Sequence, residues 1–460
     1  MSSESWIECK FSDLCDITRG ASPRPIHDFI SSTGMPWIKI ADATSSDSRF
    51  ITKTKECIKL EGVKSSVEVG PGDLILSNSA TPGLPKFVQI KACIHDGWML
   101  LRNFRGLDKR FAYWLLLNER KNLVSQGTGT VFTNLKTDIL KNHKVKIPNL
   151  DIQKAIAKQL DDIAEKIELN SKVNQTLEQI AQAIFKSWFV DFVPVKAKIQ
   201  AKQNGQDPER AAMRTISGKT DEELDQLSIE QRQQIVETAA LFPDEIENSE
   251  IGEIPKGWQW STIGDEVEVV GGSTPSTKNP DFWEGGEINW TSPKDLSGLQ
   301  DKVLLKTEKK ITEAGIEKIS SGLLPINTVL MSSRAPVGYL ALAKIPVAVN
   351  QGYIAMKCNK RLPPEYVLQW SEAWMDEIKS RASGSTFAEI SKKNFKPIKV
   401  VVPKDNILNE YSNQTKSIFD MITESVVEIE SLSNIRDSLL PKLLSGMITI
   451  NSPNKDMEVA

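Results

Sequence analysis

The stretch Asn78-Ser79-Ala80-Thr81-Pro82-Gly83 recurs as Ser332-Ser333-Arg334-Ala335-Pro336-Val337-Gly338, with one residue inserted. The match continues outward through Trp6 and Trp258, Asp13 and Asp265, Gly20 and Gly272, Pro23 and Pro275, Trp37 and Trp290, Phe132 and Phe387, and Pro148 and Pro403. The offset drifts only from 252 to 255 residues, so residues 1–190 and 258–446 are predicted to share one fold. Because most other side chains differ, the repeat favours a protein that binds two related but unequal things.

Composition places the chain among ordinary globular proteins. Its 460 residues are 40% hydrophobic and 25% charged, enough for about three domains at roughly 150 residues each. No run of about 18 apolar residues occurs, and the start Met1–Trp6 lacks the features of a secretory signal, so we expect a cytoplasmic protein. Five cysteines without a CxxC pair, and only three histidines, predict buried reduced thiols and no metal site.

The net charge of −3 is unevenly distributed along the chain. Residues 221–250 hold ten acidic residues and one basic residue, which leaves a charge of +6 for the remainder. Basic residues gather at positions 109–110, 120–121, 141–146 and 392–399. Local potential rather than overall charge decides whether a phosphate backbone is attracted. Each cluster is therefore either a phosphate contact or a solvated face, and the sequence leaves both open.

The pattern of the two copies predicts an α+β fold. Residues 1–150 mix short apolar runs with Gly/Pro/Ser turns and one helical patch near Phe111–Leu123, and residues 258–405 repeat this pattern. Each copy is followed by a long helix, predicted over 151–190 and 406–446, and residues 447–460 form a tail. The chain is thus expected to hold two homologous globular domains related by an internal pseudo-two-fold repeat and separated by the two long helices.

The two helices carry a coiled-coil pattern. The first has Ile156, Leu160, Ile163, Ile167, Asn170, Asn174, Leu177, Ala181, Ile184 and Trp188 at spacings of four and three. The matching positions in the second are Tyr411, Thr415, Ile418, Ile422, Ser425, Ile429, Leu432, Arg436, Leu439 and Leu443. A period of 3.5 residues predicts that the helices coil together, with seam asparagines setting the register; the alternative is that each helix packs on its own globular copy. The first helix would be about 50 Å long, more than one turn of B-DNA.

Residues 191–257 between the copies are predicted to be an acidic connector with short helices. Thr220-x-x-Glu223 and Ser228-x-x-Gln231 are capping-box patterns, each of which indicates a helix start.

Each catalytic motif for which the sequence was tested is either incomplete or absent. Leu362-Pro363-Pro364-Glu365-Tyr366 lacks the Asn or Asp that an amino-methyltransferase loop needs, and Asn289 stands where a metal-dependent nuclease has lysine. The chain also lacks a GxxxxGK[ST] phosphate loop, HExxH, Gly-x-Ser-x-Gly and a dinucleotide fingerprint. We therefore expect no catalysis by this chain.

Small polar loops recur in both copies instead. Glycine lets backbone N–H groups approach phosphate, and Asn, Gln and Arg can read base edges. The candidate DNA-contacting residues are Arg24, Asn78, Ser79, Thr128, Thr130, Asn134, Lys136, Thr274, Lys278, Ser333, Arg334, Asn350, Gln351, Ser385, Thr386, Lys392 and Lys393. The alternative, that some are turn residues with structural duties, stays open. Trp98, aligned with Tyr353, is expected to pack in the core rather than to stack on bases.

At this level of detail the chain resembles a known family over essentially its whole length. The stretches 184–192, IFKSWFVDF, and 436–446, RDSLLPKLLSG, close the two helices, while 240–244, ALFPD, and 252–258, GEIPKGW, lie in the connector. All four are similar to conserved regions of the specificity subunit of type I restriction-modification enzymes.

The resemblance implies two target-recognition domains, each reading half of a bipartite, asymmetric site in double-stranded DNA. An antiparallel coil would space the domains and set the gap. The implied partners are two methyltransferase subunits, which use S-adenosylmethionine to methylate adenine, and restriction/translocase subunits, with ATP and Mg also expected on partners. The residues expected in the coil and in partner docking are Ile163, Ile167, Asn170, Asn174, Leu177, Ile184, Trp188, Ile418, Ile422, Ile429, Leu432, Leu439 and Leu443. The competing hypothesis is a non-catalytic protein scaffold without sequence-specific DNA binding.

Overall fold

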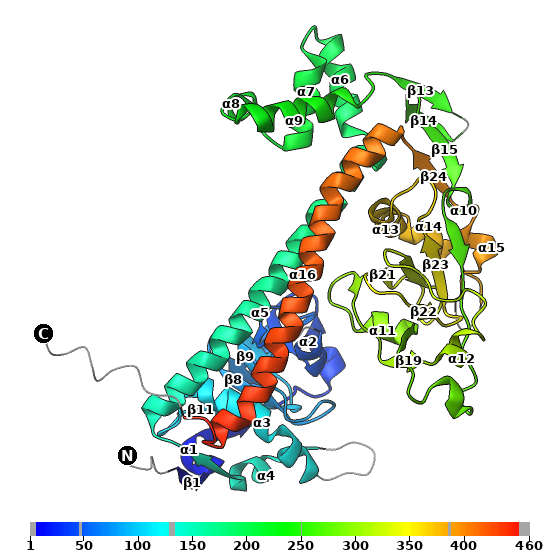
Figure 1. Cartoon of the computed structure of the whole chain (residues 1–460). Helices are drawn as coiled ribbons and strands as arrows, with labels where there is room; N and C mark the ends of the chain where they lie inside the picture. The colour runs from blue at the N-terminus through cyan, green and yellow to red at the C-terminus, as the bar shows by residue number, and fades with distance from the viewer. Residues whose placement is uncertain (1–5, 46–47, 128–133, 250, 385–387, 450–460) are drawn as a thin grey trace, which may run out of the picture. The chain divides into compact units, whose positions relative to one another are not determined.

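The computed structural model describes residues 6–45, 48–127, 134–249, 251–384 and 388–449 (Figure 1). The chain divides into two compact units, residues 1–169 with 430–460, and residues 170–429. The boundary falls inside both long helices, α5 (Leu150–Phe185) and α16 (Asp405–Leu444). The units are therefore not the predicted sequence domains, whose boundaries stay predictions.

The first unit is built on two five-stranded sheets. One has the order β2 (Asp16–Arg19), β11 (Trp98–Arg102), β8 (Leu74–Ser77), β9 (Pro85–Val88) and β5 (Phe50–Ile51). The other has the order β3 (Ile30–Ser31), β6 (Glu56–Ile58), β4 (Met35–Ile38), β10 (Ala92–Ile94) and β7 (Val67–Val69). A separate pair joins β1 (Ile7–Lys10) to β12 (Lys144–Ile147). The helical segments are α1 (Phe11–Leu14), η1 (Ile26–Asp28), α2 (Ile40–Thr44), η2 (Leu60–Ser65), α3 (Lys109–Ser125) and α4 (Thr137–Asn142).

Alternation along the central strands divides the core of this unit into two layers. Leu74 and Leu76 of β8 face a core formed with α3 and the start of α5, whereas Ile75 between them faces the second sheet. Period-two alternation places successive side chains on opposite faces, so the sheet is covered on both sides. Trp98 is fully buried in the second layer, as expected for a packing residue, and its Nε1 donates to the Ile38 carbonyl oxygen at 3.2 Å.

The second unit repeats this architecture. Its five-stranded sheet has the order β16 (Glu268–Val270), β23 (Tyr353–Lys357), β20 (Val329–Ser332), β21 (Leu340–Ala343) and β18 (Val303–Leu304). A smaller sheet has β19 (Lys309–Ile311), β17 (Ile288–Thr291) and β22 (Ala348–Val349), and β15 (Gln259–Thr262) pairs with β24 (Lys399–Val402). Its helical segments are α10 (Ile263–Glu266), η4 (Pro280–Phe282), α11 (Pro293–Ser297), α12 (Glu313–Ile316), α13 (Pro364–Ala373), α14 (Met375–Ser380) and α15 (Lys392–Phe395). The strand order of the five-stranded sheet matches that of the sheet containing β8 in the first unit, which confirms the duplicated α+β fold.

The connector folds as a small helical bundle followed by a hairpin. A π-helical turn, η3 (Lys186–Val190), leads into α6 (Val193–Gln203), α7 (Pro208–Ser217), α8 (Asp221–Asp225) and α9 (Ile229–Ala240), and then into β13 (Ile246–Ser249) paired with β14 (Gly252–Pro255). Both predicted capping boxes are present, at Thr220 and at Ser228.

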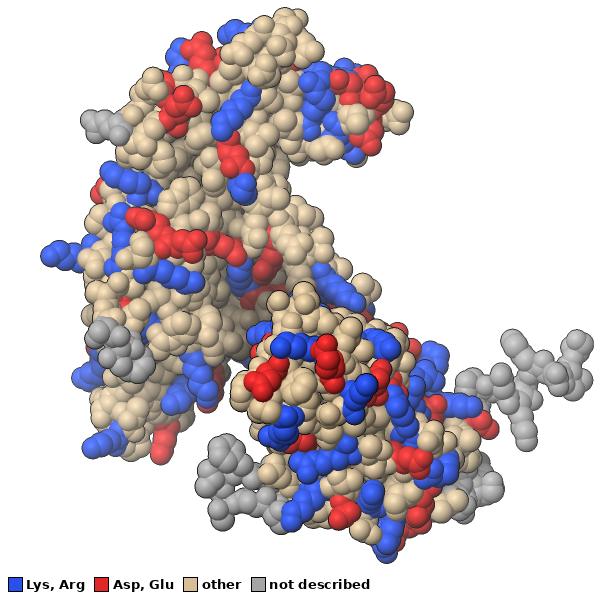
Figure 2. Space-filling model, turned by 180° about the vertical axis from the view of Figure 1, so that it is seen from behind, with Lys and Arg blue, Asp and Glu red and all other residues tan. Residues whose placement is uncertain are grey.

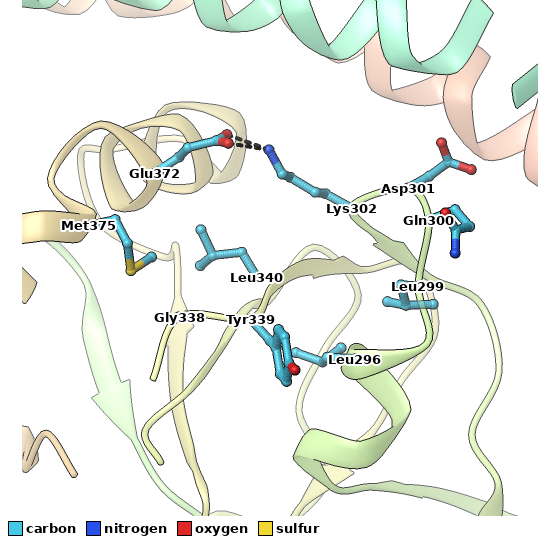
Figure 3. Close-up of a pocket in the computed structure, with 10 residues that line it drawn as sticks. All are labelled: Leu296, Leu299, Gln300, Asp301, Lys302, Gly338, Tyr339, Leu340, Glu372 and Met375. Carbon is cyan, nitrogen blue, oxygen red and sulfur yellow. Dashed lines mark hydrogen bonds and ion pairs between the residues drawn. The ribbon is translucent and has the colours of Figure 1, made fainter. Parts of the chain in front are cut away.

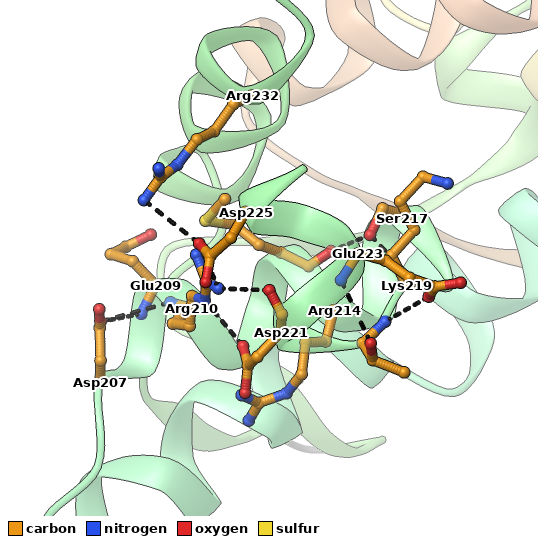
Figure 4. A network of polar contacts seen from close by, with 12 residues as sticks. Asp207, Glu209, Arg210, Arg214, Ser217, Lys219, Asp221, Glu223, Asp225 and Arg232 are labelled. Atoms are coloured by element: carbon orange, nitrogen blue, oxygen red, sulfur yellow. Dashed lines mark hydrogen bonds and ion pairs between the residues drawn. The ribbon is translucent and has the colours of Figure 1, made fainter. Parts of the chain in front are cut away.

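Much of the connector's acidic charge is used internally. Arg210 Nε donates to Asp221 at 2.7 Å and its NH2 group to Asp225 at 2.8 Å, while Arg214 donates to the other oxygen of Asp221 (Figure 4). These contacts tie α7 to α8. The hydrogen bond from Arg210 holds the pKa of Asp221 below its usual value.

The long helices pair antiparallel within each unit. In the first, the start of α5 shares a core with Leu440 and Leu443 near the end of α16, and in the second, Phe185 near the end of α5 shares a core with Tyr411 near the start of α16. The two predicted packing modes coexist, because each helix also contributes to the core of a globular domain. In the described part of the chain, none of the helices is long and apolar enough to span a membrane.

Two details of the coil prediction need correction. Asn170 does donate across the helix pair, to Glu428 Oε2 at 2.7 Å, but Asn174 Nδ2 donates to Asp301 of the globular domain at 3.2 Å. Trp188 lies in the π-helical turn η3 rather than in α5. Its ring packs against Tyr411 of α16, as the coil predicts, with centroids 6.0 Å apart, and also against Phe242 of the connector, at 5.0 Å. Heptad spacing cannot distinguish these neighbours, because a buried stripe reports burial and not the identity of the covering element.

Candidate nucleic-acid interface

Three loops of the first globular domain meet through backbone hydrogen bonds. They are the first loop (residues 20–25), the second loop (residues 77–84) and the third loop (residues 94–98). Asn78 N–H of the second loop donates to the Gly97 carbonyl oxygen of the third at 2.8 Å. Ala21 N–H of the first loop donates to the Ile94 carbonyl oxygen at 3.3 Å. Residues far apart in sequence are thereby held as one surface.

The second domain builds the same junction from residues 272–276, 332–339 and 349–353. Ser333 N–H donates to the Gly352 carbonyl oxygen at 2.8 Å, and Ser273 N–H to that of Val349 at 3.1 Å. Residues 94–98 and residues 349–353 form the same kind of turn, in which a side chain accepts the backbone N–H of a glycine two residues later. The Gly97 N–H donates to His95 Nδ1 and the Gly352 N–H to Asn350 Oδ1, each at 2.8 Å.

The second loops also establish the register of the repeat. Ser77 Oγ donates to the Thr81 carbonyl oxygen at 2.5 Å, and Ser332 Oγ to that of Pro336 at 2.7 Å. Ala80 and Ala335 share a left-handed backbone, with φ of 56° and 57°. Ser77 is therefore the equivalent of Ser332, and the insertion inferred from the sequence is wrong.

The loop glycines are required by close backbone packing. A Cβ atom on Gly20 would overlap the His95 carbonyl group, and one on Gly272 would overlap that of Val349. Any larger residue would therefore separate the first loop from the third. This explains why glycine recurs here, independently of any approach to phosphate.

In the first domain the site centres on a carboxylate. Ser22 Oγ donates to Asp96 Oδ1 at 2.5 Å, and Arg24 NH2 donates to Asp96 Oδ2 at 3.3 Å. Arg19 lies at the edge of the same group, 4.0 Å from Oδ2. The hydrogen bond from Ser22 holds the pKa of Asp96 below its usual value, so the group is ionised at neutral pH. Arg24 itself remains 73% exposed.

In the second domain an amide takes the place of the carboxylate. Thr274 Oγ1 donates to Gln351 Oε1 at 2.7 Å, and both residues are exposed. Lys392 also reaches this region, because its Nζ would lie 3.4 Å from a Cβ on Gly271. Arg334 is held to one side by Glu389, at 3.7 Å.

The predicted DNA-contacting residues fall into four groups. Those at the surface are Arg24, Asn134, Lys136, Thr274, Lys278, Gln351, Lys392 and Lys393, and those half-buried are Ser79, Arg334 and Asn350. Asn78 and Ser333 are buried in the loop junction, where the Asn78 Nδ2 donates to the Asp96 carbonyl oxygen at 3.0 Å. Thr128, Thr130, Ser385 and Thr386 lie outside the described residues. Direct DNA contact by any of them stays a prediction.

Sequence reasoning missed Ser22, His95 and Asp96. Asp96 precedes Gln351 by 255 residues, the offset of the second loops. Since Gln351 is a candidate by its side chain, the repeat predicts a site residue at Asp96 as well. A carboxylate by itself does not indicate contact with DNA, and only the fold shows the arginines beside it.

Several basic clusters have structural duties. Lys109 Nζ donates to the Gly72 carbonyl oxygen at 2.6 Å, Arg120 Nε to that of Pro82 at 3.1 Å, and Lys144 to Glu8 at 3.0 Å. Figure 2 shows basic and acidic side chains interspersed over the face drawn. These clusters are therefore not simple phosphate-binding patches. Lys392 and Lys393, by contrast, are both exposed, and Lys392 reaches the loop site of the second domain.

A pocket in the second unit marks a joint rather than a binding site. Its lining includes Asp301, Lys302 and Glu372 (Figure 3). The Lys302 ammonium group donates to both Glu372 oxygens at 2.5 Å, and Asp301 accepts from Asn174 of α5. Its charged groups are therefore already engaged, Asp301 with α5 and Lys302 with Glu372 of α13 in the same domain.

The predicted coil residues are all buried or half-buried. Other apolar residues of the helices remain exposed, including Val173 and Ile180 of α5, at 45% and 43%, and Met421 of α16. Val173 and Ile180 are seven residues apart, so they share one helix face.

Two domains with one backbone plan and different side chains at the same loop site define a duplicated recognition protein. The chain belongs to the family of the type I restriction modification DNA specificity domain, which matches residues 3–179 and 255–435. It is 28% identical to the type I restriction enzyme HindI specificity subunit of Haemophilus influenzae, over 95% of this chain and 98% of that one. It is 34% identical to the MjaIX specificity subunit of Methanocaldococcus jannaschii, over 42% and 44%. The crystal structure of a type I S subunit from M. genitalium has a similar fold, with a TM-score of 0.54 and 15% identity over 96% and 97% of the two chains. The family supports a DNA-recognition role.

Proposed function

We propose that this chain is the DNA-recognition subunit of a type I restriction-modification complex, and that each globular domain reads one half of a bipartite, asymmetric site. The observation that carries this proposal is the pair of loop sites. Their backbones share the same hydrogen bonds, from Asn78 to Gly97 and from Ser333 to Gly352. Their side chains differ at the surface, with Asp96 in one and Gln351 in the other. Similar geometry with different chemistry suits two half-sites of different sequence.

Partner subunits would dock on the coil formed by α5 and α16. In this proposal two methyltransferase subunits use S-adenosylmethionine to methylate adenine. The restriction/translocase subunits complete the complex, with ATP and Mg bound on partner subunits. Val173 and Ile180, two exposed apolar residues on one face of α5, support docking there, because a partner that covered them would remove apolar surface from water. The coil would also set the gap between the half-sites.

The test is the adenine-methylation pattern of cells that contain the methyltransferase partner with and without this chain. A bipartite motif that depends on the chain is the expected result. Exchange of residues 1–150 for those of a relative should then change only one half of the motif. If assembled complexes show no chain-dependent motif, the protein is a scaffold without sequence-specific DNA binding.

A further inference from the structure

We propose that the equivalent residues Asp96 and Gln351 each decide one base of a half-site, Asp96 by orienting Arg24 toward a guanine and Gln351 by reading an adenine directly. This inference rests on the proposed recognition function and names the bases that two loop positions select.

The two positions occupy the same place on the same backbone. Each directly follows a residue, His95 or Asn350, whose side chain accepts the N–H of the glycine two residues on. The same turn therefore presents two different side chains. The backbone of this turn is the same in both domains, and only the side chain differs. Such a position can give two related domains different base specificity.

Each side chain is oriented in advance by a hydroxyl of the first loop. Ser22 Oγ donates to Asp96 Oδ1 at 2.5 Å, and Thr274 Oγ1 donates to Gln351 Oε1 at 2.7 Å. Ser22 and Thr274 are equivalent at an offset of 252 residues. An oriented side chain loses less conformational entropy on binding, so its hydrogen bonds contribute more to discrimination.

In the first domain the oriented carboxylate acts through arginine. The second oxygen of Asp96 accepts from Arg24 NH2 at 3.3 Å, and Arg24 is 73% exposed. A carboxylate that accepts one N–H of a guanidinium restrains the side chain and leaves its remaining N–H groups able to donate outward. Bidentate donation to the O6 and N7 acceptors of guanine requires two such groups. Asp96 is thus a positioning residue for Arg24.

In the second domain the amide acts directly. Gln351 Oε1 has two lone pairs, of which Thr274 uses one, so the other can accept from the N6 amino group of adenine. The Nε2 group can then donate to N7 of the same base. This bidentate pair is the usual glutamine contact in the major groove.

The experiment compares methylation motifs of complete complexes that contain the wild-type chain, Gln351→Glu, Asp96→Asn or the control Gln259→Glu, an exposed position in β15. We expect Gln351→Glu to lose adenine selection at one position of one half-site and to shift it toward cytosine, because glutamate only accepts. Asp96→Asn should relax guanine selection about tenfold or more at one position of the other half-site, with other positions unchanged.

If a variant complex no longer methylates DNA, its base selection is measured instead by competition binding. Complexes with Gln351→Ala or Asp96→Ala are challenged with duplexes carrying each of the four bases at every half-site position. Loss of discrimination at one position supports the proposal, and undiminished discrimination at all positions overturns it. If the wild-type complex has a methylation motif and the variants have the same motif, the base assignment alone is overturned. If the wild-type complex has no motif, the proposed function is overturned.

Discussion

Arg49 and Lys302 occupy equivalent places in the two globular domains, each one residue before an edge strand, and each gives both its backbone N–H and its side chain to carboxylates of α5. Arg49 N–H donates to Glu168 at 3.2 Å, and Lys302 N–H donates to Glu178 at 2.7 Å. The Arg49 guanidinium also donates to Asp161 at 2.5 Å. The helix thus anchors each domain through the same strand end.

The Arg49 anchor should matter for stability because it is buried. Both Arg49 and Asp161 have side chains less than 10% exposed, at 6% and 8%. Arg49→Met leaves the Asp161 carboxylate with fewer donors and should cost about 3 kcal/mol, the range for breaking a buried pair. Thermal unfolding of the purified chain should show a fall of about 10 °C in the transition of the first unit.

The control for Arg49 is Lys144→Met, which removes an ion pair of which both members are more than half exposed. It should change stability by less than about 1 kcal/mol. Equal shifts in melting temperature for the two variants would show that the buried Arg49 pair contributes no more to stability than the exposed pair.

Ile422 and Met421 of α16 are neighbours in sequence that differ in burial. Ile422 is 0% exposed within the core of the second unit, whereas Met421 is 47% exposed. Ile422→Ala should destabilise the chain by about 2–5 kcal/mol through lost burial and a cavity, and Met421→Ala by less than about 0.5 kcal/mol. Denaturant unfolding measures both. A comparable cost at the two positions would place the helix seam elsewhere.

Asp301 should make the second unit less stable as pH rises. Burial raises the pKa of Asp301, although the hydrogen bond from Asn174 lowers it in part. The folded state therefore binds a proton that the unfolded state has released above its pKa of about 3.9, so stability is lost as pH rises from that value through the folded pKa. Asp301→Asn removes this titration, and its melting temperature relative to wild type should be higher at pH 7 than at pH 4.

Asp376→Asn is the matched control for Asp301→Asn, because it removes the charge of an exposed carboxylate in the same unit. Between the two pH values, the difference from wild type should change more for Asp301→Asn than for this control. If Asp301→Asn behaves in the same way as this control, the burial of Asp301 has no consequence for stability.

Lys392 and Lys393 should contribute to DNA affinity without regard to sequence. Replacing both with alanine removes two exposed charges, of which that of Lys392 lies beside the second loop site, and should lower the slope of log K against log salt by about 2. Binding titrations between low and high salt measure this slope. Alanine at Lys172 and Lys416, two exposed lysines of the long helices, is the control and should leave it unchanged. An unaltered slope in the first variant would remove Lys392 and Lys393 from the set of phosphate contacts.

Val173 and Ile180 should be needed for assembly but not for folding. Replacing both with aspartate places two charges on an exposed apolar face of α5 and should weaken binding of methyltransferase subunits at least tenfold, with little effect on the melting temperature. Gln175→Asp, exposed on the opposite side of the helix, is the control. Size-exclusion chromatography of mixed subunits reads out assembly, and full complex formation by the double variant would exclude this face.

Sequence patterns predicted the structure correctly where the residues that form the contact are close together in the sequence. The capping boxes at Thr220 and Ser228 need only residues of the same helix turn, and both are present. The heptads correctly marked buried positions of α5 but assigned Asn174 to the wrong neighbour, since a buried stripe does not identify the element that covers it. The repeat was detected, but its register in the second loop required the paired hydrogen bonds of Ser77 and Ser332.

The sequence by itself determined the duplication, the α+β class and the family, because repeated spacings and alternation persist along the chain without any knowledge of contacts. Only the tertiary structure decided which loops meet. Ser22 and Asp96 are 74 residues apart, and only the pairing of β2 with β11 brings them into hydrogen-bond distance. A site formed by non-local contacts has no period to detect, so its chemistry becomes visible only when the strands are aligned.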